Sequence, residues 1–526
     1  MFTSIGSLAT TFPIVSGVLV CVLAIGGLFL YLFTIKPALS PLNAIPGPPS
    51  AHWIFGSLKE IIDTKWSKGH FPEPALSWIK KYGGVVHYRA LLNHRVLLSD
   101  PEALKHVYNT NGENYPRSDD TRAFLRDITG GDGLLSSEGQ THTHMRKMLM
   151  PHFGFAKVKE FVGIFAAHTQ RLDTQLLPLI DTPTVIDMHT FFTKLTLDII
   201  GVSAFGYKFG SLENQNARVI AAFQMLNQPP SILYAVGSLY VPGFKNLPIK
   251  LVTQRREAKR MLFETVDQVI AAKLKAPRKA TDTKLDLVDL MLDESTHTEH
   301  VISAEEARTH VMTFLIAGHE TTSSALCWVF AMFAKHPEME AKARAECRAV
   351  AADSEDKTTI GWKSLAELKY TTAFIHEALR MFPSVAQHAG RVCAKDDYLP
   401  VSEGKPVFLP KGTTIQVNTG ALHRNPKYWS EPDTFLPERF LETTDAAAAD
   451  KALRRGQGNT YYYMPFSAGA KNCIGMRFAL AELQVVVANL LPKFSFRLAE
   501  TANLNPKAEG VSIKPVALDM TVHAAP

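Results

Sequence analysis

The chain has 526 residues, of which 46% are apolar and 20% are charged, and its formal net charge is +6. No run of lysines and arginines interleaved with aromatic residues occurs. This argues against a nucleic acid as partner and leaves an acidic protein or an anionic membrane surface open. The five cysteines are widely spaced without a CxxC pair, which argues against a disulfide framework or a zinc ribbon and is consistent with a reducing compartment.

The first predicted element is a membrane-spanning helix. Residues 14–35 form an uncharged apolar run, which as a helix spans about 33 Å, enough for the bilayer core. A cleaved signal peptide is the alternative, and it requires a basic start and a shorter apolar stretch. Residues 1–13 contain no lysine or arginine, whereas Lys36 follows the run. We therefore predict a retained anchor over residues 1–36, with the rest of the chain in the cytosol.

A proline-rich segment follows the predicted anchor. Residues 37–50 contain five prolines, which favour extended polyproline geometry and predict a semi-rigid hinge. A disordered linker is the alternative, and both interpretations place a boundary near residue 50. From residue 51 to residue 526 we find no internal repeat and no second linker, so we predict one large domain there.

The predicted domain is mainly α-helical with small β-sheets. Its clearest helix begins at Ser303, where "SAEE" forms a capping box, and runs to His336 before the helix-stopping Pro337. Apolar residues cover most of its faces, so the helix should cross the middle of the body. Strand-like alternation appears in short segments, among them residues 84–99 and 405–418.

The long helix contains the segment "AGHETT", residues 317–322. Glycine and paired threonines are poor helix formers and indicate a local opening with polar groups inside it. Helical spacing places Ala317 one turn before Thr321, so the small alanine leaves room for a flat group. A bent core helix whose threonine only satisfies backbone carbonyls is the alternative. A zinc-binding H-E-x-x-H motif is excluded because Ser323 replaces the second histidine.

A second helical segment contains "HEALR", in which Glu377 and Arg380 share one face. An exposed ion pair of this kind contributes little to the stability of the fold. A buried pair needs further hydrogen-bonding or charged partners to offset the cost of removing both charges from water. Arg439 in the segment "PERF", residues 437–440, is the predicted third charge of a buried network.

One cysteine has unusual surroundings. Cys473 lies in "FSAGAKNCIG", residues 466–475, between Gly469 and Gly475 and directly before an apolar helical pattern. Most cysteines of cytosolic proteins are inert buried thiols. Here the helix N-terminus and the nearby Lys471 and Arg477 favour a thiolate, which predicts a nucleophile or a metal ligand.

The segment 466–475, with the small Ala479 after it, resembles the haem-binding loop of the cytochrome P-450 family, F-x-x-G-x-[RK]-x-C-x-G. Three further features follow in the family's order. "AGHETT" resembles its oxygen-activating helix, "EALR" its E-x-x-R helix, and "PERF" the segment before the haem loop. With the anchor and the hinge, the resemblance covers essentially the whole chain and points to the membrane-bound eukaryotic microsomal type, fungal members included.

The resemblance implies the roles at the centre of the site. Cys473 would be the metal ligand, the axial thiolate on the iron of haem b, which pushes electron density to favour O–O cleavage. Phe466 would pack beside the thiolate, and Ala317 would border the haem. Glu320 and Thr321 would be the catalytic acid–alcohol pair that steers protons to bound dioxygen.

The resemblance also implies residues for the haem propionates, namely Arg146, Arg391 and Lys471, with His142 as a further donor. Two of these depart from the common pattern. His142 stands where tryptophan is frequent, and its alternative is a surface pair with His144. Lys471 replaces the commoner arginine, which removes a bidentate fork and keeps the charge.

The implied reaction is monooxygenation of a small lipophilic substrate. No G-x-G-x-x-G fingerprint of a flavin or nicotinamide site occurs in the chain, so the electrons of NADPH would arrive through NADPH–cytochrome P-450 reductase. We expect the reductase to dock on a basic face around Lys147, Lys471 and Arg477. The implied location is the endoplasmic reticulum membrane, as a single-pass protein whose catalytic domain, residues 51–526, faces the cytosol.

The substrate is indicated only by an apolar segment. Residues 223–251 are rich in prolines and aromatic residues, and in the family such a segment often dips into the membrane lipid near the substrate entrance. This favours a terpenoid or a fatty acid, whereas ordinary core packing is the alternative. By position alone, Phe124, Phe314, Ala317 and Val385 are expected to line the pocket.

Rival functions use the same cysteine. A haem-thiolate isomerase or dehydratase would need no oxygen-activating residues, a peroxide-driven hydroxylase would need no reductase, and a non-catalytic membrane haem-binding protein would need neither Glu320 nor Thr321. The intact "ETT" sequence and the anchor favour the monooxygenase.

Overall fold

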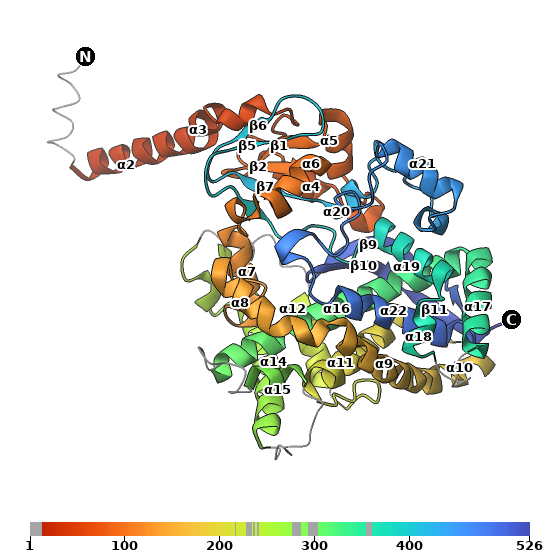
Figure 1. The fold of residues 1–526 in the computed structure, drawn as a ribbon. Helices are drawn as coiled ribbons and strands as arrows, with labels where there is room; N and C mark the ends of the chain where they lie inside the picture. Colours follow the sequence, from red (N-terminus) through yellow and green to blue (C-terminus); the bar gives the residue numbers. More distant parts are fainter. Residues whose placement is uncertain are drawn as a thin grey trace.

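An apolar helix projects from the body of the molecule at its N-terminus (Figure 1). The computed structural model describes residues 13–182, 184–215, 217–227, 234, 237–238, 241–275, 286–292, 303–353 and 360–526. The helix comprises α2 (Pro13–Leu30), the π-helical turn η1 (Tyr31–Ile35) and α3 (Lys36–Ala38). It is long and apolar enough to cross a membrane, and its apolar window is not buried in the body. The predicted N-terminal helix is therefore confirmed.

The proline-rich hinge is packed against the body. It forms the short 3₁₀ helix η2 (Pro41–Ala44), and the buried side chains of Leu42 and Ile45 join a hydrophobic cluster. Trp53 holds the base of the anchor, because its ring lies 6.0 Å from that of Phe33 and its Nε1 donates to the Thr34 hydroxyl at 2.9 Å. Residues 41–44 are thus helical, whereas the prolines predicted extended polyproline geometry, and the role of the segment as a hinge stays a prediction.

The N-terminal part of the body is built around a small mixed sheet with the order β1-β2-β7-β4. Strands β1 (Val85–Ala90) and β2 (Asn93–Leu98) lie in the predicted strand segment 84–99 and pair as an antiparallel hairpin. Strand β7 (Thr414–Gln416) runs parallel to β2, and β4 (Arg391–Val392) is antiparallel to β7. The elements that accompany this sheet are α4 (Leu58–Asp63), η3 (Trp66–Lys68), α5 (Ala75–Tyr82), α6 (Pro101–Lys105), η4 (His106–Thr110), η5 (Gly112–Asn114), β5 (Asp397–Leu399) and β6 (Val407–Leu409).

The rest of the body is helical (Figure 1). Its helices before the central one are α7 (Asp119–Thr129), α8 (Gly139–Leu149), η6 (Met150–Phe153), α9 (Phe155–Leu176), α10 (Pro178–Asp181), α11 (Met188–Phe205), α12 (Ala217–Asn227), η7 (Phe244–Asn246), α14 (Lys250–Lys275) and α15 (Leu287–Leu292). Those after it are α17 (Pro337–Ala352), α18 (Trp362–Leu365), α19 (Lys369–Met381), α20 (Thr419–Leu422), η9 (Pro437–Phe440), α21 (Asp445–Leu453), η10 (Gly469–Lys471) and α22 (Met476–Leu490).

The central helix is α16 (Ala304–Lys335), which passes through the middle of the body (Figure 1). The predicted capping box is present, since the Ser303 hydroxyl accepts from the Glu306 amide and the Glu306 carboxylate accepts from the Ser303 amide. From Thr309 to Phe333 nearly every residue is buried. The helix therefore forms the spine of the main hydrophobic cluster, as its apolar pattern predicts.

The C-terminal strands did not figure in the sequence prediction. Strands β8 (Phe494–Leu498), β11 (Asp519–Ala524) and β3 (Ile186–Asp187) form a sheet with the order β3-β11-β8, and β9 (Asn503–Glu509) pairs with β10 (Ser512–Ala517) in a hairpin. Alternation in residues 494–498 was the available signal. The pairing of β3 with β11 joins segments far apart in the sequence, so local patterns could not show it.

Candidate functional site

The cysteine loop forms a tight turn before α22. The Cys473 amide donates to the Phe466 carbonyl at 2.9 Å, and Gly475 is the N-cap of the helix. Gly469 has a φ of +69°, and a Cβ there would overlap the carbonyl of Tyr108. Glycine is therefore required for the loop to lie against η4. This packing fixes the position of the thiol.

The protonation of Cys473 differs from the sequence prediction. Its side chain is accessible to solvent, yet desolvation by the surrounding protein raises the pKa of the thiol. The Gly475 amide and the charge of Arg146 lower the pKa of the thiol, which is the direction that the sequence predicted. Their effect is smaller than that of desolvation. Local groups therefore favour the thiolate as predicted, but desolvation outweighs them within the protein chain itself. The thiolate needs the positive charge of a bound metal, which deprotonates a coordinating thiol.

Arg146 contributes to the loop from α8. Its guanidinium donates to the carbonyl of Asn472 at 2.8 Å and to the side-chain oxygen of the same residue. Asn472 precedes the cysteine, so this contact ties α8 to the cysteine loop. The predicted role of Arg146 is cofactor binding, and the structure gives it this second contact, which sequence reasoning did not anticipate.

Arg391 is positioned by the sheet. Strand β4 pairs with β7, and an isolated bridge joins Arg391 to Arg117. Arg391 is buried and donates to the Tyr115 carbonyl at 3.3 Å, while its Nε has no partner among the described residues. Two buried arginines are thus placed side by side by backbone pairing.

Lys471 and His142 complete this cluster. Lys471 is paired with Glu138, the N-cap residue of α8, and Glu138 also accepts from the Arg117 guanidinium at 3.1 Å. Desolvation and the charges of Arg391 and Arg117 lower the pKa of Lys471 to about 8. Desolvation, Arg117 and Lys471 lower the pKa of the buried His142 to about 4, so the imidazole is neutral. His142 is therefore not a surface residue.

The charge of this cluster fits a dianionic group such as the two propionates of haem. Its members are four cations and one carboxylate, namely Arg117, Arg146, Arg391, Lys471 and Glu138. Buried charges are stable only when they are paired. The excess of positive charge and the unpartnered Nε of Arg391 therefore indicate that this cluster binds an anion. Cys473 lies only two residues from Lys471, so one bound group could contact both the cluster and the cysteine.

Sequence reasoning missed Arg117, Glu138 and Asn472. Arg117 and Arg391 meet through a β-bridge, and Glu138 and Lys471 are 333 positions apart. No local pattern distinguishes an arginine in "YPRSDD" or a glutamate before α8 from ordinary surface charges. The one available hint was that the resemblance assigned several cations to the haem propionates. Such a cluster needs further charged or polar partners, which the sequence does not identify.

The central helix has one accessible stretch. Between Thr309 and Phe333 every residue is buried except Ala317, Gly318 and Thr321. The Thr321 hydroxyl donates to the Ala317 carbonyl at 2.6 Å, which is the backbone contact of the alternative interpretation, and the helix runs through this segment without the predicted opening. An alanine, a glycine and a threonine are thus partly accessible in an otherwise buried part of the helix, which suits contact with a flat ligand and with a reacting group.

Glu320 faces a different neighbour from Thr321. Its Oε1 accepts from the amides of Val511 and Ser512 in the β9–β10 turn, at 2.9 Å and 3.2 Å. Burial, opposed by these hydrogen bonds, raises the pKa of Glu320 to about 7. The predicted acid is therefore able to hold or release a proton near neutral pH, and the hairpin determines its position.

The predicted charge network is fully buried. Arg380 Nε lies 2.7 Å from Glu377 Oε2, and Arg439 Nε lies 3.2 Å from Glu377 Oε1, with the three side chains completely inaccessible. Arg439 continues to Asp450 at 2.8 Å. Further bonds from Arg380 to the His423 and Pro432 carbonyls satisfy the remaining donors. The prediction that Arg439 would complete the network is confirmed.

The remaining predicted residues are distributed as follows. Phe314 is buried and stacks on Phe153, with ring centroids 5.1 Å apart, whereas Phe124 on α7 is 44% exposed. Val385 is half-buried, and Lys147 and Arg477 are exposed. Lys471, in contrast, is drawn inward by Glu138. The expected basic face is therefore reduced to Lys147 and Arg477.

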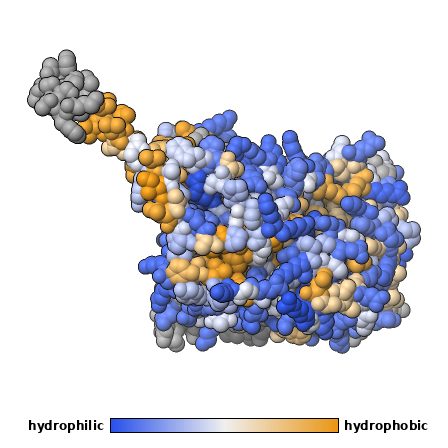
Figure 2. Space-filling view, turned by 90° about the horizontal axis from the view of Figure 1, so that it is seen from above, coloured by the Kyte–Doolittle hydropathy of each residue, from blue (hydrophilic) through white to orange (hydrophobic). Residues whose placement is uncertain are grey.

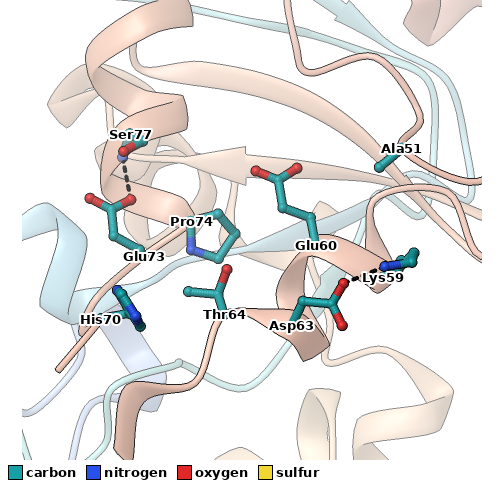
Figure 3. Close-up of a pocket in the computed structure, with 9 residues that line it drawn as sticks. All are labelled: Ala51, Lys59, Glu60, Asp63, Thr64, His70, Glu73, Pro74 and Ser77. Carbon is teal, nitrogen blue, oxygen red and sulfur yellow. Dashed lines mark hydrogen bonds and ion pairs between the residues drawn. The ribbon is translucent and has the colours of Figure 1, made fainter. Parts of the chain in front are cut away.

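A surface depression of about 610 Å³ lies elsewhere, between α4 and α5 (Figure 3). Figure 3 shows that Lys59 binds Asp63 and that the Glu73 carboxylate binds Ser77 at the rim. None of the predicted site residues lines it, and its carboxylates, Glu60, Asp63 and Glu73, each accept a hydrogen bond from a neighbouring residue. The depression is thus no part of the site around Cys473.

Comparison with known proteins agrees with this geometry. A family model described as cytochrome P-450 matches residues 46–522. Cytochrome P-450 monooxygenase 205 of Postia placenta is 29% identical, covering 89% of this chain and 88% of that protein. Cytochrome P-450 4A12 of Rattus norvegicus is 30% identical, covering 85% and 84%, and cytochrome P-450 3A7 of Homo sapiens is 28% identical, covering 90% of each. With the cysteine loop, the cation cluster and the central helix in place, the chain belongs to the cytochrome P-450 family of haem-thiolate monooxygenases.

Proposed function

We propose that this protein inserts one oxygen atom of O2 into a lipophilic substrate, with Thr321 and Glu320 as the residues that handle protons. The observation that carries the proposal is the accessible stretch at Ala317, Gly318 and Thr321 in an otherwise buried helix. Haem held by Cys473 supplies the activation of dioxygen, which its electron-rich thiolate favours. Arg117, Arg146, Arg391 and Lys471, with the neutral His142, would hold its propionates.

The protein's own part in the reaction is to deliver protons and to exclude water. The Thr321 hydroxyl donates its proton to the Ala317 carbonyl, so its oxygen keeps two lone pairs with which it can accept a hydrogen bond. Glu320 has a pKa of about 7 and carries a proton in part of the molecules at neutral pH. Buried residues precede and follow the accessible stretch on the helix, and we expect this burial to limit the entry of bulk water.

Replacement of Thr321 by alanine tests this role. We expect NADPH consumption to continue while product formed per NADPH falls on the order of 10-fold, because a positioned proton donor is lost. Substrate binding should change little. Product and hydrogen peroxide are measured together in the reconstituted system. Thr313→Ala is the control, since Thr313 makes the same bond to a carbonyl one turn earlier and is buried. Equal coupling in both variants would remove Thr321 from the mechanism.

The substrate proposed is a terpenoid or a fatty acid that arrives from the bilayer. In the segment 223–251, Val241, Leu247 and Ile249 are 51%, 41% and 37% exposed, and Phe223 and Phe244 are buried. Residues 228–233, 235, 236, 239 and 240 lie outside the described residues. Exposed apolar side chains favour contact with lipid over a purely internal role. A screen of lipids for product formation with reductase present tests the substrate class.

The anchor is proposed to hold the protein in the endoplasmic reticulum membrane, with residues 1–36 as the span, 37–50 as the hinge and 51–526 in the cytosol. Figure 2 shows the anchor as an apolar extension of a mainly hydrophilic surface. Positive charges after the span, beginning with Lys36, support this orientation. Protease added to intact microsomes should digest the domain, and protection of the domain would contradict the orientation.

Electrons are proposed to come from NADPH–cytochrome P-450 reductase docked near Lys147 and Arg477. Both side chains are exposed, and Arg477 follows the cysteine by four positions. The double substitution Lys147→Glu and Arg477→Glu should slow the first electron transfer by about 10-fold at low salt, since steering by opposite charges is lost. Stopped-flow reduction measures the rate. Lys451→Glu on α21 is the control, and a rate unchanged in the double variant argues against this face.

A further inference from the structure

The turn between β9 and β10 binds the carboxylate of Glu320. Oε1 accepts three hydrogen bonds, from the Val511 amide at 2.9 Å, the Ser512 amide at 3.2 Å and the Ser512 hydroxyl at 3.0 Å. Gly510 permits the approach, because its φ is +60° and a Cβ there would overlap the carboxylate. The turn is therefore shaped to receive this side chain.

The two oxygens of Glu320 differ. Oε1 has all three donors, whereas Oε2 is buried and has no hydrogen-bond partner among the described residues. Donors to Oε1 stabilise the carboxylate, and burial of Oε2 stabilises the protonated acid. The two effects oppose one another, and the proton of the neutral acid belongs on Oε2.

The hairpin is also fixed to α16 without the carboxylate. The Ser324 hydroxyl and the Trp328 indole, one and two turns after Glu320 on the same helix face, both donate to the Ile513 carbonyl. Ser384 adds a third link, since its carbonyl accepts from the Ile513 amide and its hydroxyl donates to the Thr321 carbonyl. The contact of Ser512 with Glu320 is therefore not needed to dock the hairpin.

Other charged groups near Glu320 are paired or neutral. Lys514 on β10 is buried, forms an ion pair with Glu509 of the same hairpin, and lies 3.0 Å from His189 at the start of α11. Burial lowers the pKa of His319 on α16 to about 4 and that of His189 to about 3. Both imidazoles are thus neutral near pH 7, where Glu320 is the group in this region that changes charge.

We propose that Ser512 is a positioning residue for proton delivery, which holds Glu320 through Oε1 and leaves Oε2 as the oxygen that carries and releases the proton. The proton that leaves Oε2 is replaced from solvent, and the three donors on Oε1 stabilise the carboxylate in between. The β9–β10 turn thereby sets how readily Glu320 releases a proton. This inference rests on the proposed role of Glu320 in the reaction.

Ser512→Ala in the haem-loaded full-length protein tests the inference, with Ser324→Ala as the matched control. The carboxyl titration of Glu320 is followed by infrared difference spectroscopy of the resting protein against Glu320→Gln. Loss of one hydrogen bond to the charged form should move the titration upward by about one pH unit. Product per NADPH at pH 7 should fall several-fold. Ser324→Ala removes a comparable bond to the same hairpin and should move neither quantity.

The outcomes separate the inference from the function on which it rests. If Glu320→Gln leaves product per NADPH unchanged, Glu320 has no part in proton delivery and both ideas fail. If Glu320→Gln lowers coupling but Ser512→Ala shifts neither the titration nor the coupling, only the positioning role is overturned. An equal shift with Ser324→Ala would assign the effect to loosening of the hairpin and would also overturn it.

Discussion

Replacement of Cys473 by serine is expected to abolish monooxygenase activity and the spectrum of a thiolate-bound haem. Cys473 is exposed at the surface of the cysteine loop, and serine offers a hydroxyl that is a far weaker ligand for iron at neutral pH. The loop itself should persist, because the bonds of Arg146 to Asn472 and of the Cys473 amide to Phe466 involve no sulfur. The reduced carbon monoxide difference spectrum measures the effect.

Cys347→Ser is the matched control for this experiment. Cys347 is also a free thiol, but it is buried beside Thr371, with the two side-chain atoms 3.6 Å apart. The variant should keep the thiolate spectrum and most of the activity. A thiolate spectrum that survives in Cys473→Ser would show that another residue binds the iron, and the assignment of the cysteine loop would then be wrong.

Replacement of Glu377 by alanine is expected to prevent accumulation of folded protein. The carboxylate is the shared partner of Arg380 and Arg439, and all three side chains are inaccessible. Removing it leaves two buried guanidinium groups without this partner, which costs about 3–5 kcal/mol. Whole domains are stable by only about 5–15 kcal/mol. Urea unfolding followed by circular dichroism, together with the yield of haem-loaded protein, measures the loss.

Glu367→Ala provides the comparison for this network. Glu367 pairs with Lys369 at 4.0 Å on the surface, and both side chains are mostly exposed. Its removal should change the free energy of unfolding by less than about 0.5 kcal/mol. If Glu377→Ala were tolerated as well as Glu367→Ala, the buried network would not be a determinant of the fold.

The sequence predicted the elements whose determinants are local. The N-terminal helix, the helix from Ser303 to His336 and the strands in residues 84–99 follow from an apolar run, a capping box and alternation within one segment. The cysteine loop was identified by its resemblance to a family motif, and residue spacing alone led no further than a nucleophile or a metal ligand.

The electrostatic outcome at Cys473 shows where local reasoning failed. The helix N-terminus and Arg146 do favour the thiolate, but desolvation by residues from other segments is larger and reverses the direction of the pKa. Burial depends on everything packed around a group, and a pattern of ten residues carries no information about it.

What the sequence by itself determined was a mainly helical domain behind an apolar helix, with a cysteine suited to bind a metal, and its resemblance to a known family identified that cysteine as a haem ligand. Only the tertiary structure decided the partners of the site, since the pairing of Arg117 with Arg391, of Glu138 with Lys471 and of Glu320 with Ser512 each joins distant segments. The physical reason is that helices and loop motifs depend on short-range spacing, whereas charge pairing and desolvation depend on which segments the packed core brings together.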